Sequence, residues 1–167
     1  CSSDLLPIHA RRLVFILDTS KSMGAGGVTS RLELAKRELV RAVSQLPEDA
    51  KFNVVLFQSV VELWSKQLEL ATPAAKIHAS AFVSAQRPAG KTATYDALQA
   101  ALRMGVDVEA IYLLSDGAPS DGTIVAPERI LGLIRQENAT RRTRIYTLGA
   151  FGDDAEGGRE QIGRAHV

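Results

Sequence analysis

Five consecutive residues near the N-terminus have the most chemically informative spacing in the sequence, Asp18-Thr19-Ser20-Lys21-Ser22. One carboxylate and two hydroxyls stand at alternate positions, directly after an apolar run over residues 13–17. This spacing lets the three side-chain oxygens turn toward one point. Hard oxygen ligands of this kind are those that Mg²⁺ prefers. The motif therefore predicts a metal site with few protein anions, which is open to an acidic ligand from another molecule.

Two further oxygen-rich segments stand where the chain passes between predicted elements. Asp116-Gly117 follows an apolar run that ends at Ser115, and Gly90-Lys91-Thr92-Ala93-Thr94 precedes a helical pattern. In open α/β sheets, ligands bind at the carboxyl ends of the strands, near the point where the strand order reverses. If the first strand and the strand before Asp116 are neighbours, all three segments converge on one site.

The hydrophobic pattern predicts the elements that position these segments. Continuous apolar runs are typical of strands that are buried on both faces, and a two-residue connection before residues 60–64 indicates an antiparallel edge strand. The predicted strands cover residues 13–18, 52–57, 60–64, 110–115 and 144–148. Helical spacing predicts four helices, between Ser30 and Pro47, over 73–85, over 95–104, and from about 127.

Strands that alternate with helices predict an α/β fold with a doubly wound, mostly parallel central sheet, one antiparallel edge strand and helices on both faces, a Rossmann-like arrangement. Ser30 with Glu33 predicts a capping box, and Thr72 and Thr94 are predicted N-caps of later helices. The segment after Leu148 is acidic and rich in glycine where a doubly wound sheet would add a helix and a strand. We therefore expect a C-terminally truncated domain.

Composition indicates an ordinary globular chain. Its 167 residues are 46% hydrophobic and 23% charged, and a formal net charge of +1 predicts no attraction to nucleic acid or to an anionic membrane. No apolar run approaches the roughly 20 residues of a membrane helix. We divide the chain into an N-terminal extension (1–11), one domain (12–161) and a non-native tail (162–167).

Both ends of the chain indicate a fragment, which we expect to come from a longer bacterial or metagenomic protein with further domains. The single cysteine, Cys1, is interpreted as a fragment end, with a lipid-bearing cysteine as the alternative. The compartment stays open, and we favour an extracytoplasmic or cell-surface location.

At the oxygen-rich segments the chain resembles the von Willebrand factor A (VWA) domain family and its metal-ion-dependent adhesion site (MIDAS). The family pattern is D-x-S-x-S, then a Thr in a Gly-Thr type loop, then an Asp after a central strand. Here these are Asp18 to Ser22, Gly90-Lys91-Thr92, and Ser115-Asp116-Gly117. The sequence departs from the commonest form in having Lys21 and Lys91 where glycine is frequent.

The resemblance implies a role for each residue. Ser20 and Ser22 would bind the metal directly, Thr92 directly or through water, and Asp18 and Asp116 partly through bridging water. The metal would be Mg²⁺ (or Mn²⁺ or Ca²⁺), and a carboxylate from a protein partner would complete its shell. The expected rim around that partner comprises Lys21, Met23, Lys91 and Gly117.

Two other functional classes remain as alternatives. A metal-independent structural or interaction domain of the same fold is the first. The second is a phosphohydrolase, because a strand that ends in Asp resembles the nucleophile strand of haloacid dehalogenase-type phosphatases. Those enzymes need a second Asp two residues later as the general acid, and that position is Ser20. No catalytic residues are therefore predicted, and we expect the chain not to be an enzyme.

Overall fold

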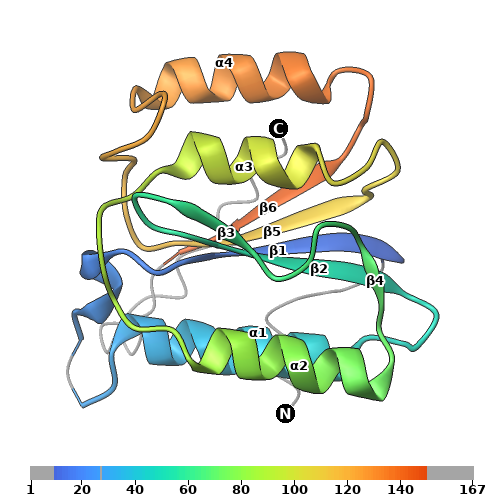
Figure 1. Cartoon of the computed structure of the whole chain (residues 1–167). Helices are drawn as coiled ribbons and strands as arrows, with labels where there is room; N and C mark the ends of the chain where they lie inside the picture. The colour runs from blue at the N-terminus through green and yellow to red at the C-terminus, as the bar shows by residue number, and fades with distance from the viewer. Residues whose placement is uncertain (1–9, 27, 150–167) are drawn as a thin grey trace, which may run out of the picture.

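A central sheet separates two layers of helices in the computed structural model, which describes residues 10–26 and 28–149 (Figure 1). The elements in chain order are β1 (Arg12–Asp18), the 3-10 helix η1 (Lys21–Gly24), α1 (Arg31–Gln45), β2 (Lys51–Phe57), β3 (Val61–Leu63), β4 (Glu69–Leu70), α2 (Pro73–Ser84), α3 (Thr94–Leu102), β5 (Ala110–Leu114), α4 (Pro127–Asn138) and β6 (Arg144–Leu148). The predicted α/β class is confirmed.

The strand order is β3-β2-β1-β5-β6, with β1 at the centre. Strand β1 pairs in parallel with β2 on one side and with β5 on the other, so that Leu17 lies opposite Leu56 and Leu114. Strand β6 pairs in parallel with β5. The first strand and the strand before Asp116 are therefore neighbours, which meets the condition for the three oxygen-rich segments to converge. The strand order reverses at β1, and the carboxyl ends of β1 and β5 meet at one edge of the sheet.

The side of the sheet beyond β2, away from β6, contains antiparallel strands. Strand β3 pairs with β2 in antiparallel register, as the hairpin spacing predicts. Strand β4 also pairs with β2, and it is absent from the elements predicted from the sequence. Two residues are too few to produce a recognisable period, so that only the pairing itself reveals this strand.

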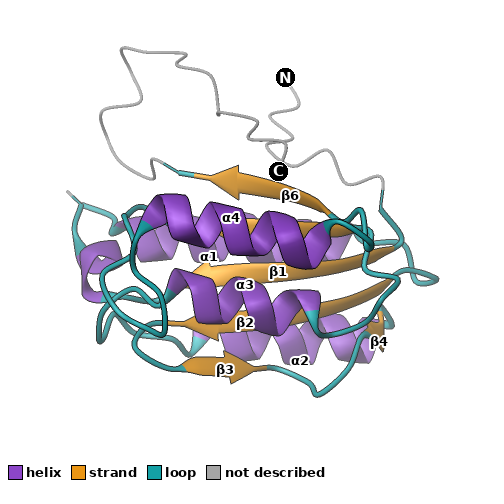
Figure 2. Cartoon of the chain, turned by 90° about the horizontal axis from the view of Figure 1, so that it is seen from above, coloured by secondary structure: helices purple, strands orange, loops and turns teal. Residues whose placement is uncertain are grey.

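Helices cover both faces of the sheet, α1 and α2 on one side and α3 and α4 on the other (Figures 1 and 2). Alternate residues of β1 serve the two layers. Leu13, Phe15 and Leu17 pack in the cluster beneath α1, whereas Val14 and Ile16 pack in the cluster beneath α3. All five are fully buried, which explains why β1 is a continuous apolar run.

Of the three residues predicted as N-caps, two are correct and one is wrong. The Ser30 hydroxyl accepts the Glu33 amide at 3.3 Å, and the Thr72 hydroxyl accepts the Ala75 amide at 3.2 Å. Ala93 rather than Thr94 occupies the N-cap of α3, and Thr94 is its first helical residue. The Thr94 hydroxyl is buried and has no hydrogen-bond partner within the described part of the chain.

Several predictions concern parts of the chain outside the described residues. These are Cys1, most of the N-terminal extension, the tail over 162–167 and the end of the domain at 161. The structure therefore tests neither the domain boundaries nor the expected truncation. Among the described residues, no helix combines the length and the apolar character needed to cross a membrane.

The N-cap of α1, Ser30, can be tested by substitution. Ser30→Ala removes the acceptor of the Glu33 amide and should lower the free energy of unfolding by about 1 kcal/mol. Urea denaturation checks this value. Ser44→Ala, near the other end of the same helix, should change stability by less than about 0.5 kcal/mol. Equal effects from the two substitutions would contradict the capping role of Ser30.

Candidate functional site

The site is organised around Asp18, the last residue of β1, which is fully buried. Its Oδ1 accepts the Ser20 amide at 2.8 Å, and its Oδ2 accepts the Ser115 hydroxyl at 2.5 Å. Burial raises the pKa of the Asp18 carboxyl above its ordinary value, and these hydrogen bonds from Ser115 and Ser20 oppose that shift. Asp18 therefore joins the loop after β1 to the loop after β5.

The two serines of the motif lie side by side at the start of η1. The hydroxyl oxygens of Ser20 and Ser22 are 3.0 Å apart, and Ser22 donates to Asp116 Oδ1 at 3.0 Å. Ser20 is buried and Ser22 is exposed, so the pair spans from the interior to the surface. Four of the predicted metal ligands thus form one connected group, Asp18, Ser20, Ser22 and Asp116.

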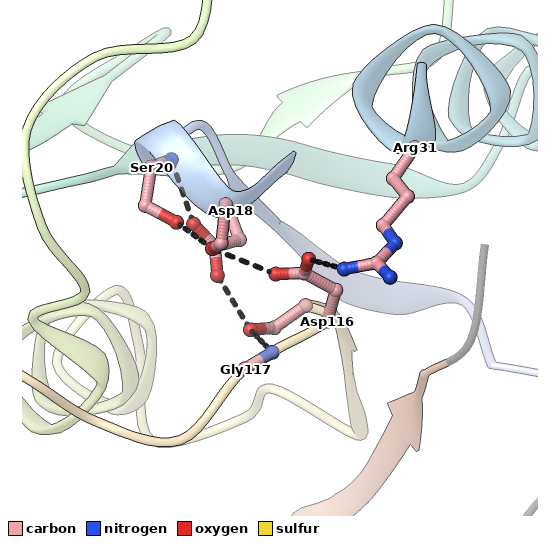
Figure 3. Close-up of polar contacts among 7 residues, drawn as sticks. Asp18, Ser20, Arg31, Asp116 and Gly117 are labelled. Atoms are coloured by element: carbon pink, nitrogen blue, oxygen red, sulfur yellow. Dashed lines mark hydrogen bonds and ion pairs between the residues drawn. The ribbon is translucent and has the colours of Figure 1, made fainter. Parts of the chain in front are cut away.

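Asp116 has a charged partner that the sequence analysis did not identify. Its side chain is 3% exposed, and its Oδ2 accepts Nη1 of Arg31 at 2.7 Å (Figure 3). Arg31 is the first residue of α1. A cation at a helix N-terminus opposes the helix dipole, so this placement was a signal that Arg31 has a partner outside its own helix.

Thr92 joins the group through the backbone of its loop. The Ala89 amide donates to the Thr19 carbonyl at 2.9 Å, and the Lys21 amide donates to the Gly90 carbonyl at 3.3 Å. On its other side, the Thr92 carbonyl accepts the Ser120 amide at 3.0 Å. Thr92 itself is buried. The segment from Asp18 to Ser22 is therefore hydrogen-bonded to the Thr92 loop and to Asp116, and the Thr92 loop is hydrogen-bonded to Ser120 further along the loop after β5.

Of the four residues predicted to form the rim, three are exposed and one is buried. Lys21, Lys91 and Gly117 are exposed at this end of the sheet. Met23 is fully buried in the core cluster that contains Leu32 of α1. The turn of η1 directs this side chain inward, so that Met23 anchors the motif in the core.

The group offers few anionic ligands. Among the described residues, no set of three or more His, Cys, Asp or Glu side chains is arranged to hold a metal ion. The side-chain oxygens that contact one another belong to two carboxylates and to serine hydroxyls. These are hard donors that suit Mg²⁺, and a cation held mainly by neutral donors keeps much of its charge.

A doubly wound sheet with an oxygen-rich loop cluster at its switch point defines an α/β domain of the class in which ligands commonly bind at this edge of the sheet. The sequence profile of the von Willebrand factor type A domain matches residues 11–156, so the chain belongs to that family.

Curated relatives include inter-alpha-trypsin inhibitor heavy chain H3 of Homo sapiens, 30% identical over 160 residues. The match covers 89% of this chain and 17% of that relative. Another is von Willebrand factor A domain-containing protein 3B of Homo sapiens, 28% identical, with 84% of this chain and 10% of that protein covered. The chain thus spans a small part of the length of these relatives.

Solved structures with the same fold include a von Willebrand factor type A protein from Catenulispora acidiphila, with a TM-score of 0.69 and 21% identity over 82% of this chain and 32% of that chain. The PilB minor pilin from Streptococcus sanguinis has a TM-score of 0.54 and 23% identity over 68% of this chain and 32% of that chain. Membership in this family supports a protein-interaction module.

Gly90 allows a test of how the loops hold the site together. Its φ of +63° lies in the left-handed region, and an added Cβ would collide with the Gln58 side chain. Gly90→Ala should therefore lower the free energy of unfolding by about 1–3 kcal/mol. Thermal or urea denaturation provides the measurement.

Gly132, in the interior of α4, is the matched control because an added Cβ there meets nothing within 4 Å. Gly132→Ala should raise the free energy of unfolding by about 0.5–1 kcal/mol. If both alanine variants shift the free energy of unfolding in the same direction, the left-handed backbone of Gly90 does not require glycine.

Proposed function

We propose that this chain is a divalent-cation-dependent protein-binding module of adhesion or assembly. Its cation, Mg²⁺ or alternatively Mn²⁺ or Ca²⁺, is held by Asp18, Ser20, Ser22, Thr92 and Asp116. An acidic residue of a protein partner completes the shell. The observation that carries the proposal is the continuous contact from Asp18 through the two serine hydroxyls to Asp116, at the switch point of the sheet.

The chemistry of the donor set fits a hard cation. The hydroxyls of Ser20 and Ser22 face each other at 3.0 Å, and both can turn their lone pairs toward a common ion. Ser22 is exposed, so an ion that contacts this pair stays accessible to another molecule. The buried Asp18 gains from a positive charge nearby, because its present partners are a hydroxyl and an amide.

The chain's own residues set the position of the cation and the sign of the surface around it. Asp18 fixes the Ser20 backbone, Ser115 fixes Asp18, and Met23 anchors η1 in the core. When bound, the cation supplies an electrophilic centre for one carboxylate oxygen of the partner. The exposed Lys21 and Lys91 add positive charge at this end of the sheet, which favours an anionic partner.

A metal-independent interaction module of the same fold is the second candidate. One observation favours it, the ion pair between Arg31 and Asp116, which already supplies a cation to one of the two site carboxylates. A phosphohydrolase is less well supported, since Ser20 stands where the general acid of such an enzyme is needed and its hydroxyl contacts Ser22. Turnover of a generic phosphate ester would favour that class.

Metal binding is tested by calorimetric titration with Mg²⁺. Ser22→Ala removes one exposed hydroxyl of the group and should weaken the affinity at least about tenfold, because one of few ligands is lost. Ser44→Ala, an exposed serine of α1, should bind Mg²⁺ as the wild type does. Asp18→Ala should abolish binding. Equal heats from the wild type and Asp18→Ala would contradict the metal site.

Partner recognition is tested with a displayed peptide library that is selected on the immobilised chain in Mg²⁺. Selected peptides should contain Asp or Glu and should be released by EDTA, because the carboxylate completes the shell of the cation. Replacement of that residue by Asn or Gln should lower the affinity at least about tenfold. Peptides that bind equally well in EDTA would favour the metal-independent module.

A further inference from the structure

We infer that Arg31 is a built-in counter-cation of the site. Its ion pair with Asp116 holds the loop after β5 in place when no metal is bound, and it lowers the affinity for a divalent cation that approaches the same carboxylate. This inference rests on the proposed metal-binding function, and it names an internal regulator of that site.

The Asp116 carboxylate is shielded from water and hydrogen-bonded at both oxygens. Both carboxylate oxygens have donors, Oδ1 from the Ser22 hydroxyl at 3.0 Å and Oδ2 from Arg31 Nη1 at 2.7 Å (Figure 3). The carboxylate is 3% exposed, whereas the Arg31 side chain is 39% exposed. A carboxylate that is so well shielded needs a strong donor, and charge-assisted bonds from arginine are among the strongest in proteins. Arg31 therefore stabilises the Asp116 carboxylate.

The second step concerns the position of Arg31 in the fold. It opens α1, and Asp116 lies 85 positions later, directly beyond β5. The ion pair thus connects a helix on one face of the sheet to the loop at the end of a central strand. The helix dipole disfavours a cation at this end of α1. The ion pair with Asp116 offsets this unfavourable interaction of Arg31.

The third step is the effect on a metal ion. Of the two site carboxylates, Asp116 is paired with a guanidinium, whereas Asp18 accepts from a hydroxyl and an amide. A fixed positive charge next to a ligand repels a second cation and neutralises part of the attraction of that ligand. Arginine cannot lose its proton in a protein, so this effect is permanent unless the side chain moves. Arg31 consequently makes the site a weak binder that stays assembled without metal.

The test compares Arg31→Gln with Arg37→Gln. Arg37 is an exposed residue of the same helix, so both substitutions remove one positive charge from α1. In EDTA, Arg31→Gln should lower the unfolding midpoint, because Asp116 loses its charged partner. In calorimetry, it should bind Mg²⁺ at least about fivefold more tightly than the wild type. Arg37→Gln should match the wild type in both measurements.

Arg31→Lys separates charge from shape. Because it keeps the positive charge, its affinity for Mg²⁺ should stay near that of the wild type. If Arg31→Gln unfolds in EDTA, its midpoint measured over a series of Mg²⁺ concentrations gives the affinity through linkage.

Two outcomes overturn the inference in different ways. If the wild type binds Mg²⁺ and Arg31→Gln binds it equally or more weakly, the metal site stands but the counter-cation role is wrong. If neither protein binds Mg²⁺, Mn²⁺ or Ca²⁺, the proposed function fails and this inference fails with it. A midpoint that still drops in EDTA would then identify the ion pair as purely structural.

Discussion

The buried carboxylate of Asp18 is the constraint on which the site depends. A carboxylate at the end of a central strand is removed from water on every side, and it is tolerated only where donors surround it. Those donors come from the Ser20 amide and from the Ser115 hydroxyl, which is 97 positions away in the sequence. Satisfying Asp18 therefore brings together the loops that follow β1 and β5.

The topology of the sheet makes this meeting possible. Because β1 is parallel to both of its neighbours, the loops after β1 and β5 leave the same edge of the sheet. The loop before α3 then closes the cluster with backbone hydrogen bonds to both of them. Hydroxyls, rather than further carboxylates, fill the space between Asp18 and Asp116. The result is a group of hard donors with little net negative charge, which suits a cation that still needs a ligand from outside.

The ion pair between Asp116 and Arg31 places a positive charge of the protein itself within the site. An arginine in the ion pair satisfies one carboxylate without a metal, and it does so from a different layer of the fold. A site of this type can remain folded with or without a bound cation. Under the proposed function, the affinity for a cation would depend on competition between this fixed internal charge and the diffusible cation. The exposed lysines add positive charge where the proposed acidic partner would bind.

Much of the fold follows directly from local pattern. The apolar run of β1, the cap at Ser30 and the hairpin spacing before β3 were each recognisable because they depend on neighbouring residues alone. The convergence of Asp18, Ser20, Ser22 and Asp116 was also predictable, since the order of strands and helices determines which strand ends share an edge. The metal and its partner remain proposals that the sequence suggested.

Other features required the tertiary structure. Strand β4 exists only through its pairing with β2, and Thr94 stands inside α3 because the chain enters that helix one residue earlier than its side chain suggests. The sequence by itself determined which oxygens make up the proposed site and which strand ends present them, because both depend on short-range spacing. Only the tertiary structure decided that Met23 points into the core and that Arg31 reaches Asp116, because the direction of a side chain and a contact across 85 positions arise from the packing of the layers.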